Sequence, residues 1–264
     1  MMAVSLNRPQ SKVAARQYTG QLVDQVRRRS HAFVNTDEGA LPEWLSKGLQ
    51  CKSSKAYEQA ASWFQQAAQA GDMRAQYHLA GLYRNGQGVS QDIAQAAYWY
   101  GKSAAQGYAR AQCNLGMLYR QGRGVSKDAV QAAMLFRRAA EQGHAKAQYG
   151  LGDLYREGLG VAQDFGLAAT WFRLAAEQGH VPAQYRLGEL YRQGRGVEQD
   201  FAQAANWLRQ AAEQGCNLAQ HSLGTLYEHG LGVPQDIVQA VTWFRKAVEH
   251  GYVESGPEPR TLEG

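Results

Sequence analysis

The sequence predicts an all-α fold, a solenoid built from stacked helix–turn–helix units. One pattern recurs every 36 residues, and its opening Ala-Gln pair begins at Ala75, Ala111, Ala147, Ala183 and Ala219. Glycine pairs and an aspartate follow at the same step, and the apolar residues between them have helical spacing. A fixed period of this size is typical of units that contact only their neighbours. It favours a long binding surface over a catalytic pocket.

The unit formed by residues 147–182 shows how each element is predicted. Its first half, AQYGLGDLYRE, places Leu151 and Leu154 on one side of a helix. The segment GLGVAQ then breaks the helix, because its two glycines permit backbone angles that a side chain would forbid. Asp164 stands where a short oxygen acceptor caps a helix start. The second helix, FGLAATWFRLAAEQ, has a broad apolar stripe and ends before Gly179.

Two sets of repeated positions predict the core. Small residues mark where helices approach closely, and large residues face them, as native packing density requires. The small set is Ala80, Gly116, Gly152, Gly188 and Gly224; the large sets are Trp63, Trp99, Leu135, Trp171, Trp207 and Trp243, and Phe64, Tyr100, Phe136, Phe172, Leu208 and Phe244. The aromatic file is interpreted as core, and a ladder for a ligand is the less favoured alternative.

The pattern LG-x-LY-x-x-G-x-GV-x-x-D, followed by A-x-WF-x-x-AA-x-x-G, resembles the Sel-one-like repeat, a relative of the tetratricopeptide repeat. The resemblance covers about residues 56–252. It implies a right-handed α-solenoid whose first helices line a concave face, and adaptor or scaffold roles in assembling protein complexes. It carries no catalytic motif. The secreted, cysteine-rich branch of that family staples each repeat with a disulfide, and this chain lacks that cysteine pattern.

The composition divides the chain into four expected parts. Residues 1–38 form a basic, partly disordered arm, since residues 1–31 carry six arginines or lysines and one acid. Residues 39–56 are expected to form an N-terminal helical cap, residues 57–252 the solenoid, and residues 253–264 a flexible tail with two prolines. The arm could contact nucleic acid or anionic lipid, but a solubilising segment is the favoured interpretation.

The sequence shows no targeting signal and no catalytic, phosphate-binding or metal-binding motif. No apolar run has the length of a signal peptide or membrane span, so the cytoplasm is expected. Three cysteines at unrelated repeat positions fit reduced thiols. No nucleophile elbow, phosphate loop or zinc-binding pattern is present, and we expect no catalytic residue, no cofactor and no metal.

The candidate binding residues are those that change from unit to unit on the first helices. They share three neighbouring positions on one helix face. They are His78, Asn85, Asn114, Met117, Gln121, Asp153, Glu157, Arg186, Glu189, Gln193, Thr225 and His229. Acidic points at Asp153, Glu157 and Glu189 would suit a peptide or helix with some basic residues. A merely solvated face is an equal alternative.

A further repeated position forms a possible arginine ladder of Arg84, Arg120, Arg156 and Arg192, which Glu228 interrupts. Guanidinium groups at this spacing could hold carboxylates or phosphates of a partner. They could also bridge to neighbouring acids and to the carbonyls that close the first helices. The structural role is favoured, because the arginine belongs to the repeated pattern.

These observations predict a non-enzymatic interaction module, an adaptor or scaffold that binds a partner protein or peptide through the concave groove. The alternative is an immunity or regulatory protein that inhibits a cognate enzyme or toxin by one-to-one binding, and a hydrolase is a remote third. We expect a monomer, or a weak dimer through the last repeat, which no capping helix follows.

Overall fold

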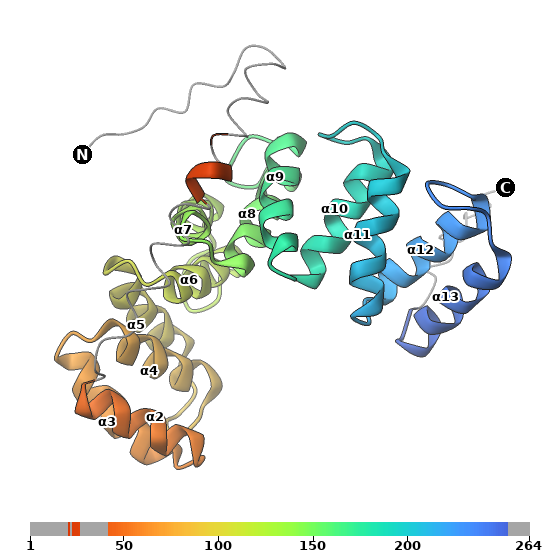
Figure 1. Cartoon of the computed structure of the whole chain (residues 1–264). Coiled ribbons are helices and arrows are strands. Elements are labelled where there is room, and N and C mark those ends of the chain that lie inside the picture. Colours follow the sequence, from red (N-terminus) through yellow and green to blue (C-terminus); the bar gives the residue numbers. More distant parts are fainter. Residues whose placement is uncertain (1–20, 22, 27–41, 253–264) are drawn as a thin grey trace, which may run out of the picture. The chain divides into compact units, whose positions relative to one another are not determined.

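The computed structural model describes residues 21, 23–26 and 42–252, and all regular structure in them is α-helical (Figure 1). The arm predicted over residues 1–38 lies largely outside the described residues, and the tail over residues 253–264 lies entirely outside them. The predicted all-α fold of helix–turn–helix units is confirmed. The helices are α2 (Glu43–Ser53), α3 (Tyr57–Gln69), α4 (Met73–Asn85), α5 (Ile93–Ala105), α6 (Ala109–Gln121), α7 (Ala129–Glu141), α8 (Ala145–Glu157), α9 (Phe165–Glu177), α10 (Val181–Gln193), α11 (Phe201–Glu213), α12 (Asn217–His229) and α13 (Ile237–Glu249).

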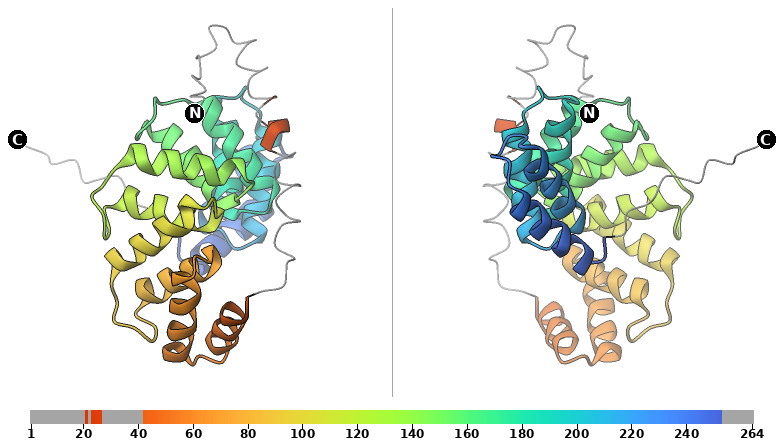
Figure 2. Two further views of the ribbon diagram at one scale, coloured as in Figure 1. Left: turned by 90° about the vertical axis from the view of Figure 1, so that its left-hand side faces the viewer. Right: turned by 90° about the vertical axis from the view of Figure 1, so that its right-hand side faces the viewer.

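The chain divides into two compact units, Met1–Leu174 and Ala175–Gly264, with the boundary inside α9. Within the first unit, consecutive helices from α2 to α8 pack side by side, and two further views show their layering (Figure 2). Within the second unit, α10 packs on α11, α11 on α12 and α12 on α13. In each unit the even-numbered helix is the first of a pair and the odd-numbered helix is the second.

The helix boundaries follow the predicted capping chemistry. Asp128 accepts hydrogen bonds from the backbone N–H groups of Val130 and Gln131 at 2.9 and 3.0 Å, and Asp92, Asp164, Asp200 and Asp236 cap their helices through similar bonds. First helices from α4 to α12 end at a left-handed glycine. The aspartate and glycine predictions are therefore confirmed.

Glutamines supply further bonds that bind successive helices together. The glutamine of each Ala-Gln pair is buried, and its Nε2 donates to a carbonyl at the end of the preceding second helix; Gln112 reaches Ala104 at 3.2 Å and Gln148 reaches Ala140 at 3.2 Å. Gln142 donates in turn to Gln112 Oε1 at 2.9 Å. Because the glutamines of the Ala-Gln pairs are buried, these bonds offset the cost of removing their polar atoms from water.

Another glutamine closes the first helices. Gln91, Gln163, Gln199 and Gln235 each donate Nε2 to the backbone carbonyl of the ladder position seven residues earlier, at 2.8–2.9 Å. One suggested task of the ladder arginines was to close these carbonyls. In these four units the glutamine side chain does so, because it approaches from the loop immediately below the helix end.

Burial confirms the small set and most of the second large set as core, and the Trp set in part. The second aromatic set is almost fully buried from Phe64 to Leu208, and Trp171 is 2% exposed. Trp63, Trp99 and Trp207 are half-buried. The small set is needed for contact: a Cβ added to Gly152 would lie 2.8 Å from the Phe172 ring. These aromatic rings therefore serve packing between helices.

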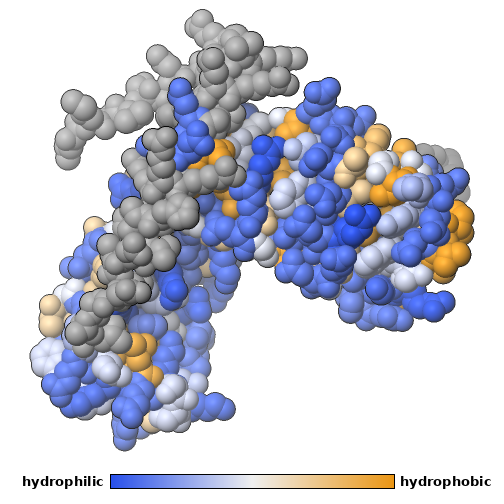
Figure 3. Space-filling view, in the orientation of Figure 1, coloured by the Kyte–Doolittle hydropathy of each residue, from blue (hydrophilic) through white to orange (hydrophobic). Residues whose placement is uncertain are grey.

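The last helix, α13, differs from its predecessors on one face. Val241 is 51% exposed and Val248 is 65% exposed, whereas the same positions in earlier units hold buried alanines such as Ala205 and Ala212. Apolar colouring over the start of α13 is visible in Figure 3. In earlier units the first helix of the following pair packs on the second helix, and no described helix takes that place after α13.

Candidate protein-binding surface

The candidate residues occupy the first helices at positions three and four residues apart, and so share one side of each helix. This side of the first helices is called the first-helix face below. In the first unit they come from α4, α6 and α8, and in the second from α10 and α12. Exposure varies with position. The last position of each set is exposed, at Asn85, Gln121, Glu157, Gln193 and His229, while the other positions are half-buried or, at Asp153, buried.

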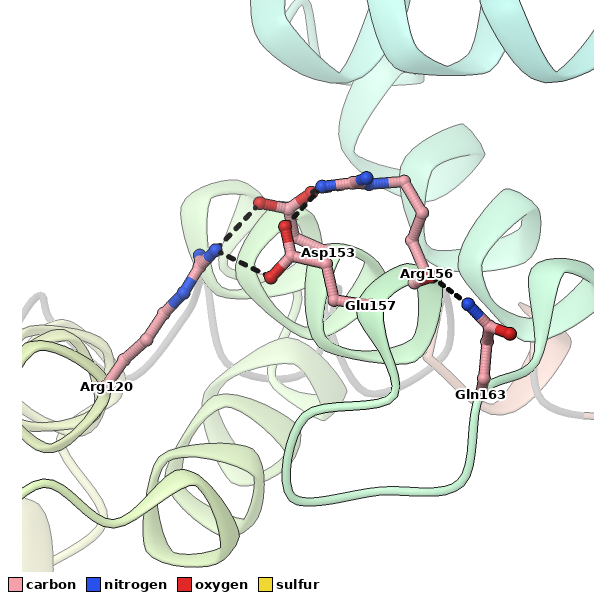
Figure 4. Close-up of polar contacts among 5 residues, drawn as sticks. All are labelled: Arg120, Asp153, Arg156, Glu157 and Gln163. Atoms are coloured by element: carbon pink, nitrogen blue, oxygen red, sulfur yellow. Dashed lines mark hydrogen bonds and ion pairs between the residues drawn. The ribbon is translucent and has the colours of Figure 1, made fainter.

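The two acids of α8 form a closed ion-pair network with two ladder arginines (Figure 4). Arg120 on α6 reaches Asp153 Oδ2 at 3.1 Å and Glu157 Oε2 at 3.3 Å. Arg156 donates its Nε to Asp153 Oδ1 at 2.9 Å and also pairs with Glu157. The Asp153 side chain is only 7% exposed. These carboxylates are therefore committed to the protein's own arginines, which removes the reason to expect a basic ligand here.

In the second unit the ladder is satisfied within one helix. Arg192 Nη2 lies 2.8 Å from Glu189 Oε2, and its Nε also donates to this carboxylate. The hydrogen bond to Glu189 raises the pKa of Arg192 despite partial burial. Gln193 donates to the same carboxylate at 3.2 Å. The geometry of Arg120, Arg156 and Arg192 thus agrees with the favoured structural role of the ladder.

The ladder predicts unequal effects for two matched substitutions. Arg120→Gln should lower the free energy of unfolding by about 1–3 kcal/mol, because buried Asp153 loses a charged partner. Arg84→Gln should change it by less than about 0.5 kcal/mol, since the Arg84 side chain donates only to Asn85 and forms no ion pair among the described residues. Urea denaturation of the full chain measures both values. Equal losses of unfolding free energy in the two variants would contradict the distinction between Arg120, which is ion-paired, and Arg84, which has no ion pair within the described part of the chain.

The N-terminal end of the surface has a different character. Lys52 Nζ lies 3.4 Å from His78 Nδ1, and the His78 ring stacks on Phe64 at 5.2 Å between centroids. Burial, followed by the charges of Lys52 and Arg110, lowers the pKa of His78 to about 4, against a smaller opposing effect of Asp72. His78 is therefore neutral near pH 7, and its unprotonated Nδ1 accepts a hydrogen bond from the Lys52 ammonium group.

The described residues contain no group of three or more histidines, cysteines or acids placed to hold a metal ion. Burial raises the pKa of the Cys113 thiol to about 12, which opposes formation of a nucleophilic thiolate.

None of the helices in the described part of the chain is both long and apolar enough to cross a membrane.

Comparison with known protein families gives a match to the Sel1 repeat. The family model matches six consecutive segments, at residues 40–72, 74–108, 109–144, 145–180, 181–216 and 217–252. The first segment includes α2, within the region expected to form a cap, and α2 packs on α3 through Leu45 and Gly48. No curated protein matches the chain.

Two solved structures are similar over most of the chain. One is c5321, described as a protective antigen present in uropathogenic Escherichia coli strains displaying an SLR fold, with 38% identity and a TM-score of 0.76. This similarity covers 89% of the present chain and 49% of the antigen, so the chain spans about half of that protein's length. The other is a Sel1 repeat protein from Oxalobacter formigenes, with 36% identity, a TM-score of 0.74, and coverage of 79% and 86% respectively.

An immunity protein from Pseudomonas aeruginosa, Pa5087, is more distant. It shares 21% identity over 87% of the present chain and 82% of its own, with a TM-score of 0.45.

Proposed function

Because the chain belongs to the Sel1 repeat family, we propose that it is a non-enzymatic interaction module, an adaptor or scaffold that binds a protein or peptide through the first-helix face. One observation carries the proposal. The repeated residues are occupied by capping, glycine turns and core packing, whereas exposed positions such as Gln121 and His229 change from unit to unit. Variable exposed side chains on a repeated frame are where such proteins place specificity.

The proposal retains the expected division of the chain and its compartment. Residues 57–252 form the binding solenoid, residues 39–56 cap it, residues 1–38 form a basic arm and residues 253–264 a tail. We place the protein in the cytoplasm, which is supported by its three cysteines, none of which forms a disulfide.

The proposal is tested by substituting large tryptophan side chains on the first-helix face, so that they block access to it. We expect Gln121→Trp combined with Gln193→Trp to abolish recovery of the partner from native lysate, because both side chains are exposed on first helices. The matched control is Gln95→Trp with Gln203→Trp, at two exposed glutamines of the second helices α5 and α11. Unchanged helical circular dichroism must accompany the loss. Equal recovery with both double variants would refute the assignment of the face.

The same experiment separates the scaffold from the inhibitor. Several partners from one pathway support a scaffold. A single stoichiometric partner whose activity falls on binding would instead identify the protein as an immunity or regulatory protein.

We also propose that the exposed face of α13 mediates weak pairing with a second copy of the chain. Its apolar residues Ile237, Val241 and Val248 follow helical spacing, and all are more than half exposed. A two-fold axis near the middle of this stripe sets Val241 of each copy opposite Val248 of the other, so the face is self-complementary. One short helix per copy offers a small contact area, which implies weak association.

Sedimentation equilibrium of the full chain tests this pairing. We expect the average mass to rise with concentration, and Val241→Glu with Val248→Glu to remain monomeric. A wild-type protein that is monomeric throughout the millimolar range would rule the pairing out.

A further inference from the structure

The arginine ladder has an additional member at its N-terminal end. A Cβ added to Gly48 on α2 would meet the Phe64 ring at 2.5 Å, just as Gly116 and Gly152 meet Phe136 and Phe172 at 2.9 and 2.8 Å. Gly48 therefore occupies the same position in its helix as those glycines. Lys52 lies four residues after Gly48, as Arg120 lies four after Gly116. Lys52 is thus the first cation of the ladder, and Arg84 is the second.

These first two cations lack the acids that neutralise the rest. Arg120, Arg156 and Arg192 all pair with carboxylates, and those carboxylates come from the positions of Asp153, Glu157 and Glu189. The corresponding residues near Lys52 and Arg84 are uncharged: Leu49, Ser53, Gly81, Asn85, Met117 and Gln121. Helices α4 and α6 contain no acidic residue at all. Among the described residues, neither Lys52 nor Arg84 forms an ion pair.

The positive charges of Lys52 and Arg84 repel each other in the structure. Burial lowers the pKa of Lys52, and the charge of Arg84 lowers it further. Arg110 adds to the positive charge around His78. The acid that opposes this effect on the pKa of His78, Asp72, already accepts hydrogen bonds from the N–H groups of Arg74 and Ala75 at the start of α4. An anion placed between Lys52 and Arg84 would relieve this repulsion and accept charge-assisted hydrogen bonds from both.

We propose that Lys52 and Arg84, beside His78, form a binding site for a carboxylate-bearing segment of a partner polypeptide. This inference rests on the proposed function and deepens it, since it assigns the chemistry of the partner at one end of the first-helix face. Half-buried Leu49 and Met117 flank the cations. Apolar side chains beside cationic groups suit a peptide that carries both acidic and apolar residues, and they suit a nucleic acid backbone poorly.

The test is a selection of random twelve-residue peptides against the full chain. We expect aspartate and glutamate at no less than twice their frequency in the starting library. The enrichment should disappear with Lys52→Met and Arg84→Gln together. It should persist with Arg123→Gln and Lys127→Gln, which remove the same charge from two exposed positions in the loop after α6. A selected peptide should bind the first double variant at least ten-fold more weakly than the control.

A second readout places the carboxylates at this site. Binding of a selected acidic peptide should raise the pH midpoint of the His78 ring signals in NMR by one unit or more, since a nearby negative charge favours protonation. The inference would be overturned if the selected peptides showed no enrichment of acidic residues. It would also be overturned if the Arg123/Lys127 control variant lost as much enrichment as the Lys52/Arg84 variant, or if the pH midpoint of the His78 ring signals did not move. A phosphoserine peptide that outcompetes its glutamate twin would overturn the carboxylate assignment. If the tryptophan variants of the first-helix face lose the native partner and the Lys52/Arg84 variant keeps it, the proposed function stands and this inference fails.

Discussion

Gly160→Ala is expected to lower the free energy of unfolding by about 3 kcal/mol or more. Gly160 has φ +69°, in the left-handed region, and an added Cβ would lie 2.2 Å from the backbone oxygen of Ala129 at the start of α7. Backbone strain at such a residue costs about 1–3 kcal/mol, and overpacking against a fixed backbone adds about 1–3 kcal/mol. Gly88, Gly124 and Gly232 make the same close approach to the second helix of the preceding pair.

The matched control is Gly107→Ala. Gly107 also has a positive φ, +94°, but nothing lies within 4 Å of its added Cβ. Its loss should be about 1–2 kcal/mol, from backbone strain alone. Guanidinium denaturation of the two full-length variants measures the difference. Equal losses would mean that the loop glycines serve only conformation and not contact between successive units.

Trp171→Ala is expected to lower the free energy of unfolding by about 3–5 kcal/mol, the range for deletion of a buried aromatic side chain. Trp171 is 2% exposed, and α9 also buries Phe172 and Ala175. The half-buried Trp207 at the equivalent position of α11 provides the comparison, and Trp207→Ala should cost clearly less. A loss well below 1 kcal/mol for Trp171 would instead support an aromatic ladder for a ligand.

The fold could be predicted from the sequence because its determinants are local and repeated. Asp128 caps a helix that starts at the next residue, and Gly122 ends the helix before it, so a short segment decides each boundary. Six matching units then remove the ambiguity of any single one.

The glutamine bonds could not be predicted in the same way. Gln112 and Gln142 are hydrophilic, and glutamine is mostly a surface residue. Gln112 is buried and Gln142 is half-buried, because the end of one second helix lies close to the next first helix. The constant glutamine in each Ala-Gln pair was the available signal, and only the packed structure shows its carbonyl partner.

Sequence spacing predicts which helix side carries the candidate residues, but it does not predict how their charges are paired. Helical spacing places Asp153 and Glu157 on the first-helix face, as expected. Whether these acids face solvent or an arginine depends on a residue distant in the sequence. Arg120, on the preceding first helix, precedes Asp153 by 33 residues and Glu157 by 37, and it reaches both carboxylates. Sequence spacing gives the neighbouring helix but does not give the reach of the guanidinium group.

The central claim is that exposed, non-repeating positions of the first helices bind the partner, whereas exposed positions of the second helices do not. Its most direct test is the dissociation constant of the co-purified partner, measured by titration calorimetry. We expect at least a ten-fold increase for the Gln121→Trp and Gln193→Trp double variant, and less than a two-fold change for Gln95→Trp with Gln203→Trp. Equal affinities of the two double variants, or a greater loss in the second, would contradict the account.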